Sequence, residues 1–147
     1  MSIFHTSLTD RTILRIAGDD RIDFMQNLVT QDVARPQSGA CVMAALLTPQ
    51  GKLLYDFLIY VEDDALLVDC EAAEADALAK KLLLYKLRAD VTIEPTDLNV
   101  HALWQENGLP CPPMARFYED PRSDGLGLRG FFSASPDIAL PERSADD

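Results

Sequence analysis

The chain has 147 residues, of which 48% are hydrophobic, and its 24 acidic and 13 basic side chains give a net charge of −11. This length and composition predict one buried core, hence one domain or one domain with an appended piece. The negative charge opposes nonspecific binding to nucleic acid or anionic membrane, and no apolar run approaches the ~20 residues that span a bilayer. The amino-terminal residues MSIFHTSLTDR lack a signal-peptide core and the basic, acid-poor character of a transit peptide. We therefore expect a cytoplasmic protein without nucleic-acid or membrane partners.

The cysteines and histidines do not suggest a metal or a nucleophilic site. Cys41, Cys70 and Cys111 are odd in number and lack CxxC spacing, which argues against a disulfide framework and against a zinc site. His5 and His101 stand alone in the sequence. We expect buried thiols, no metal site and no catalytic residue.

The first elements in the chain are a strand and a helix. Thr12 to Ile16 predicts a short strand, and Gly18 ends it. Asp20, with Asp23 three residues later, resembles a capping box, and the apolar spacing that follows predicts a helix to about Val29.

The next stretch predicts an antiparallel meander of three strands. A strand from Cys41 to Leu47 is followed by the turn Thr48-Pro49-Gln50-Gly51, in which proline presets φ and glycine accepts a positive φ. Lys52 to Val61 is the central strand, and Leu66 to Asp69 returns beside it. Strand periodicity places two apolar sets on opposite faces of the central strand. One set is Leu53, Tyr55, Phe57, Ile59 and Val61; the other is Leu54, Asp56, Leu58 and Tyr60.

Asp56 is the carboxylate that interrupts the apolar central strand. In one interpretation it is structural and holds backbone amides or a cationic side chain, because an unpaired buried charge costs several kcal/mol. In the other it is an acid that faces a ligand. The sequence leaves both interpretations open.

The second half of the chain predicts one further helix and several strands. Ala72 to Arg88 has helical periodicity, and Val91–Ile93, Val100–Leu103 and Gly127–Phe132 have the composition of strands. Six of the nine prolines lie in the last 40 residues, so we place a domain at residues 1–105 and the start of a second segment at residues 106–147. The element order predicts the α+β class, an antiparallel sheet with helices on one face, ferredoxin-like with additions.

Several motifs occur together in one order and spacing. They are GDDRIDFMQNLVTQDV, then LLTPQGKLLYDFLIYVEDDALLVDCEAAEADALAKKLLLYKLRADVTIEP, then FYEDPRSDGLGLRG. In the order and spacing of these segments, the chain resembles the amino-terminal half of the YgfZ family. That family comprises folate-binding, iron-sulfur cluster assembly proteins, which are related to the glycine-cleavage T-protein, an aminomethyltransferase. The resemblance implies that this chain has the α+β fold of the folate-binding domain of these proteins. It also implies a tetrahydrofolate cofactor.

The resemblance also implies five folate-binding residues. Asp56 matches one of two adjacent acids that face the folate in T-proteins, and Tyr55 stands where the other acid would be. Asp69 matches an asparagine that touches the pterin ring, although an N-cap of the second helix is an equal alternative. Thr30 and Gln31 match a segment near the ligand cavity.

Two departures from the family shape the expected function. The loss of one acid at Tyr55 favours a non-enzymatic factor that binds tetrahydrofolate and assists maturation of [4Fe-4S] proteins, with folate and iron-sulfur clients or assembly factors as partners. A tetrahydrofolate-dependent aminomethyltransferase and an interaction domain without a ligand are the alternatives. The family's lysine-glycine-cysteine motif and its Gly-Gln-Glu do not occur in these residues. We therefore expect a truncated chain or a naturally short homologue.

Overall fold

A computed structural model describes residues 3–34, 39–105, 117–119, 121 and 128–132. These residues form nine strands, two α-helices and one 3-10 turn. The elements are β1 (Ile3–Leu8), β2 (Arg11–Ala17), α1 (Arg21–Leu28), β3 (Cys41–Leu47), β4 (Leu53–Val61), β5 (Ala65–Glu71), the 3-10 turn (Ala72–Glu74), α2 (Ala75–Lys86), β6 (Thr92–Pro95), β7 (Asn99–Gln105), β8 (Phe117–Glu119) and β9 (Leu128–Phe132). No helix in the described ranges is long and apolar enough to cross a membrane.

Five strands form an antiparallel sheet in the order β3-β4-β5-β2-β6. The elements β2-α1-β4-β5-α2-β6 give the βαββαβ order of a ferredoxin-like fold, and β3 adds an edge strand beside β4. This confirms the predicted α+β class and its ferredoxin-like type.

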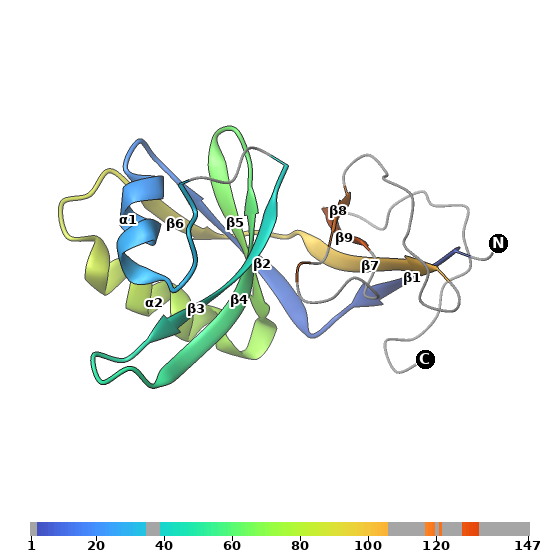
Figure 1. Cartoon of the computed structure of the whole chain (residues 1–147), viewed down its shortest axis with the longest axis horizontal. Helices are drawn as coiled ribbons and strands as arrows, with labels where there is room; N and C mark the ends of the chain where they lie inside the picture. Colours follow the sequence, from blue (N-terminus) through green and yellow to red (C-terminus); the bar gives the residue numbers. More distant parts are fainter. Residues whose placement is uncertain (1–2, 35–38, 106–116, 120, 122–127, 133–147) are drawn as a thin grey trace.

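The remaining four strands form a second antiparallel sheet in the order β1-β7-β9-β8. In Figure 1, β1 and β7 run side by side away from the five-stranded sheet and continue the directions of β2 and β6. The described strands therefore form two sheets, where the sequence analysis expected one. The predicted boundary at residue 105 stays a prediction. Of the two described strands beyond it, β9 pairs with β7, and β8 pairs with β9.

The main core lies between the five-stranded sheet and both helices. Leu14, Ile59 and Val68 contribute from the strands, and Met25 and Leu78 from the helices, all fully or almost fully buried. A smaller cluster on the opposite face of the sheet consists of Ile13, Tyr60, Leu67 and Val100. The helices thus cover one face, as predicted, and the other face is left to the second sheet and to the site described below.

Two glycines stand where the backbone requires positive φ. Gly51 has a φ of +85° in the β3–β4 turn, where its N–H donates to the carbonyl of Thr48. Gly18 has a φ of +110° before α1, and a Cβ at this position would collide with the backbone carbonyl of Asp90. The predicted turn at residues 48–51 is confirmed.

The predicted elements agree with the structure in place and type, with three corrections. The second helix is shorter than predicted, because residues 72–74 form the 3-10 turn and Leu87 leaves the helix with a φ of 47°. The capping box is wrong, since the Asp20 carboxylate accepts the N–H of Asp90 and caps no helical N–H. Strands β1 and β8 were not predicted.

Candidate functional site

A buried ionic cluster is centred on Asp69, the fifth residue of β5. One carboxylate oxygen, Oδ1, accepts a hydrogen bond from Nε of Arg11 at 2.8 Å. The other, Oδ2, accepts from the hydroxyl of Tyr60 at 2.6 Å and from Nε and Nη2 of Arg129 at 3.1 and 2.9 Å. Asp69 is 0% exposed, and a buried carboxylate is tolerated only when paired and hydrogen-bonded in this way.

The cluster fixes the charge states of its members. Burial and the neighbouring carboxylate of Asp69 hold the pKa of Tyr60 well above its ordinary value, so the hydroxyl stays protonated and donates. Burial alone lowers the pKa of Arg129, but the attraction of Asp69 outweighs it and the net pKa is raised. Asp69 is therefore a binding partner for protein side chains, and the interpretation of it as a helix N-cap is wrong because it lies within β5.

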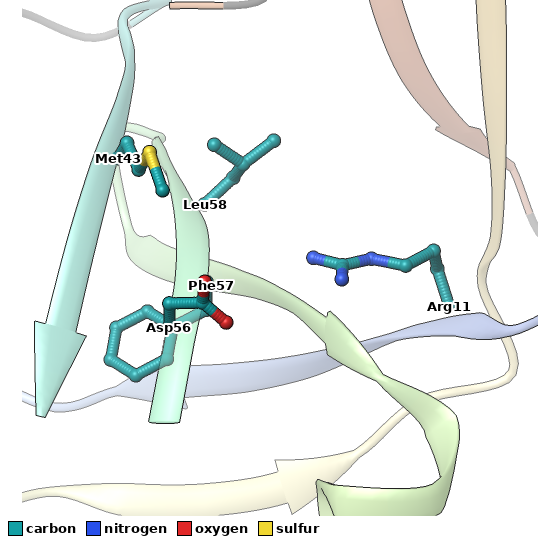
Figure 2. Close-up of a pocket in the computed structure, with 5 residues that line it drawn as sticks. All are labelled: Arg11, Met43, Asp56, Phe57 and Leu58. Atoms are coloured by element: carbon teal, nitrogen blue, oxygen red, sulfur yellow. The ribbon is translucent and has the colours of Figure 1, made fainter. Parts of the chain in front are cut away.

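Arg11 connects this cluster to a small pocket. Its Nη2 donates to the backbone carbonyl of Asp69 at 2.7 Å, in addition to the Nε contact, so two bonds hold the guanidinium. Figure 2 shows this guanidinium reaching from β2 toward Asp56 and Leu58 on β4. Met43 and Phe57 complete the lining. The pocket lies beyond the last β4–β5 pair, Leu58 with Asp69, where the two strands no longer pair.

Asp56 is exposed and lines this pocket. Its carboxylate has no hydrogen bond or ion pair with any residue of the described ranges. The structural interpretation of Asp56, which required a buried and paired carboxylate, therefore does not hold. Asp56 and Arg11 instead offer an acceptor and a preorganised donor to one small space.

Tyr55 lies on the other face of the same strand. Its side chain packs against the main core beneath the helices, as expected for alternation along β4. The structure therefore does not bring Tyr55 and Asp56 together.

Thr30 and Gln31 follow α1 and run along the open edge of β3. The Oγ1 of Thr30 accepts the N–H of Ala45 at 3.0 Å, and the Thr30 N–H donates to the Ala45 carbonyl at 3.0 Å. The side-chain amide of Gln31 donates to the carbonyl of Met43 at 3.4 Å. These two residues protect a strand edge, and Gln31 reaches the backbone of one pocket residue.

A second contact joins the sheets near the cluster. The hydroxyl of Tyr118 on β8 donates to Glu62 at 2.6 Å, and its ring lies 4.9 Å from that of Tyr60, centroid to centroid. The four-stranded sheet is thus attached to the five-stranded sheet through Tyr118 and through Arg129.

The cysteines do not form a reactive site in the described residues. Cys70 is buried in the main core. Burial raises the pKa of its thiol from the ordinary value near 9 to about 11, and the negative charges of Asp69, Glu74 and Glu71 add to this shift, while the positive charge of Arg11 opposes it. Cys41 is half-buried. Cys111 lies outside the described residues. No group of three or more potential metal ligands occurs in the parts of the chain that the structure describes.

Sequence reasoning missed the arginines that define this site. A buried carboxylate in the middle of a strand, such as Asp69, needs a cationic partner. One such partner, Arg129, lies in the segment FYEDPRSDGLGLRG, which the sequence analysis had already noted. Nothing in the local sequence distinguishes Arg11 from the other arginines.

Comparison with known proteins finds relatives among iron-sulfur cluster assembly factors. The chain is 28% identical to the protein named iron-sulfur cluster assembly factor IBA57 homolog of Pyricularia oryzae, over 95% of this chain and 40% of that protein. It is 30% identical to the human IBA57, over 83% of this chain and 41% of that protein, and 32% identical to the mouse IBA57, over 72% and 32%. No family model matches the chain. The chain spans between about a quarter and two-fifths of the length of the curated relatives it matches.

Among solved structures, the glycine cleavage system aminomethyltransferase T of Bartonella henselae has a similar fold. The TM-score is 0.64 at 14% sequence identity, over 69% of this chain and 28% of that protein. The predicted T-protein-like fold is therefore confirmed, and a likeness at this identity concerns the fold alone.

The names of the relatives contradict one expectation. The fungal, human and mouse proteins are all named as mitochondrial, which conflicts with the cytoplasmic location expected here. That expectation rested on the lack of a transit-peptide pattern in residues 1–11, and a pattern in so few residues does not decide a compartment.

Proposed function

Because the chain is homologous to the amino-terminal part of the IBA57 assembly factors of the YgfZ family, we propose that it acts in the assembly or maturation of iron-sulfur proteins. The observation that carries this proposal is the similarity over 95% of the chain to a protein named for that role. Its partners would be components of the iron-sulfur assembly machinery and the proteins that receive clusters. The likeness to the aminomethyltransferase concerns the fold and does not favour the transferase alternative.

We further propose that the pocket between Arg11 and Asp56 contributes to tetrahydrofolate binding. A pterin ring presents N–H donors and a carbonyl acceptor along one edge, and such an edge can donate to the Asp56 carboxylate and accept from the Arg11 guanidinium. The cavity volume of about 40 Å³ is far below the roughly 300–1,000 Å³ of complete ligand pockets. These residues therefore fit one end of the ligand, and the remainder would lie outside the pocket.

Of the five residues first expected to bind folate, Asp56 is the one whose position supports this proposal directly. Asp69 would act through Arg11, because both of its carboxylate oxygens are engaged by protein side chains. Gln31 would act through the backbone of Met43. Tyr55 faces the core, and Thr30 bonds the edge of β3, so we expect neither to contact the ligand.

The folate proposal is tested by calorimetric titration of tetrahydrofolate into the purified chain. Asp56→Asn removes the charge and should weaken binding about 10-fold, as expected for the loss of a charge-assisted hydrogen bond. Asp64→Asn, in the exposed β4–β5 turn, makes the same chemical change away from the pocket and should have no effect. Equal affinities of the two variants would contradict the assignment of the pocket.

The assembly proposal is tested in cells that lack their own IBA57-type protein. Expression of the chain should raise the activity of a [4Fe-4S] enzyme and leave an enzyme without a cluster unchanged. The Asp56→Asn variant then shows whether the pocket matters for this role. Rescue by both forms would support assembly and argue against a need for folate.

A further inference from the structure

The outer face of α2 carries large apolar side chains that are exposed to solvent. Leu84 is 72% exposed and Leu87 is 84% exposed, while Leu78 and Leu82 on the inner face are buried in the main core. Isolated exposed leucines are common, but these two continue one helical stripe that begins at Ala77. The outer face of α2 thus ends in two exposed leucines, with Lys80 and Ala77 on the same stripe, that its own sheet does not use.

The backbone at Leu87 adds a separate observation. Its φ of 47° and ψ of −112° are costly for a residue with a Cβ, and glycine is the residue that ordinarily adopts such a conformation. Such strain persists where the surrounding structure or a function requires it, and at Leu87, just past the end of α2, it leaves the leucine side chain 84% exposed.

We propose that this face binds a second copy of the chain, with the two α2 helices antiparallel about a two-fold axis. The exposed stripe begins with Ala77 and Lys80 and ends with two leucines, so an antiparallel pair places each leucine over Ala77 or over the stem of Lys80. In the register centred on Leu82, Leu87 of each copy lies over Ala77 of the other. Leu84 then packs against the aliphatic stem of Lys80 from the second copy.

Charge complementarity supports the same register. Asp76 in the first turn of α2 lies opposite Arg88 of the second copy, just beyond the last turn. Both side chains are exposed, and within the described residues neither forms an ion pair. A parallel pair would instead bring Asp76 to Asp76 and Arg88 to Arg88, which like-charge repulsion disfavours.

The contact is small, since one helix of twelve residues supplies most of it. It belongs to the low end of interface sizes, so we expect a weak dimer with a micromolar dissociation constant. The inference is independent of the proposed function.

The test is sedimentation velocity of the full chain from about 1 to about 500 μM, a range that brackets micromolar affinity. The average mass should rise from 16.3 kDa toward twice that value. Leu84→Arg should weaken association at least about 10-fold, because it removes an apolar contact and opposes Lys80. Leu53→Arg is the matched control, since Leu53 is also exposed but lies on the β3–β4 hairpin.

A charge exchange tests the register. Asp76→Arg and Arg88→Asp should each weaken association about 3- to 10-fold, and the double variant should return to within about 2-fold of wild type. Melting temperatures near wild type show that these exposed substitutions leave the fold intact. The same exchange at the exposed pair Arg15 and Asp64 should leave association unchanged.

Three results would overturn the inference. The first is a monomer at every concentration, including a monomer that binds phosphatidylglycerol vesicles through Leu84. The second is equal weakening by Leu84→Arg and Leu53→Arg. The third is a folded double charge variant that remains as weak as its single parents.

Discussion

Arg129 on β9 donates from Nε and Nη2 to a single carboxylate oxygen of Asp69 on β5, at 3.1 and 2.9 Å. The two residues are 60 positions apart and belong to different sheets. Their ion pair is almost completely buried, with side chains 5% and 0% exposed. It therefore attaches the four-stranded sheet to the ferredoxin-like sheet at the point where Arg11 also enters the cluster.

Removal of the Asp69 carboxylate should strongly destabilise the protein. Asp69→Ala leaves Arg129 buried without its carboxylate partner and takes the acceptor from the Tyr60 hydroxyl, so we expect a loss of about 3–5 kcal/mol in the free energy of unfolding. Urea denaturation measures this loss. Asp56→Ala removes an exposed carboxylate from the neighbouring strand and should change the free energy of unfolding by less than about 0.5 kcal/mol. Similar values for the two variants would contradict the structural role of the cluster.

The buried thiol of Cys70 predicts a loss of stability in alkali. Its pKa is about 11 in the folded protein and near 9 when unperturbed, so between these values the unfolded chain releases a proton that the folded chain retains. This contribution to stability is complete below pH 9 and is lost as the pH rises toward 11. The free energy of unfolding of wild type should thus fall more steeply over this range than that of Cys70→Ala. Parallel pH profiles would show that the thiol is not perturbed.

Leu87 should be a position where glycine stabilises. Its positive φ costs about 1–3 kcal/mol, and its exposed side chain contributes little burial within one chain. Glycine relieves the strain but adds freedom to the unfolded chain, so Leu87→Gly should raise stability by about 0.5–1 kcal/mol. Leu87→Ala keeps the Cβ and should gain nothing. Thermal denaturation at low micromolar protein concentration separates this effect from self-association.

Two glycines with positive φ should respond unequally to alanine. Gly18→Ala combines strain with a collision against the carbonyl of Asp90, whereas a Cβ at Gly51 meets open space. We expect Gly51→Ala to cost about 1–2 kcal/mol and Gly18→Ala more than about 3 kcal/mol. Chemical denaturation compares the two, and equal losses would mean that the loop before α1 can move away from Asp90.

The sequence by itself determined most of the ferredoxin-like core. Strand and helix periodicities located β2, α1, β3, β4, β5 and α2, because these patterns depend on which local side chains face the core. The alternation along β4 also placed Tyr55 and Asp56 on opposite faces, which the structure confirms. The resemblance to T-proteins had suggested both as folate contacts.

Tertiary structure alone decided the partners of Asp69 and the exposure of Asp56. Arg11 and Arg129 lie 58 and 60 positions from Asp69, and no local pattern selects them from the other basic residues. Asp56 is exposed because its side chain lies on the face of β4 that points away from the helices, where the described residues leave it uncovered. What covers the face of a strand is a property of the assembled fold. The division of the strands into two sheets could not be predicted for the same reason, since no local pattern records that β1 pairs with β7 and that β7 pairs with β9.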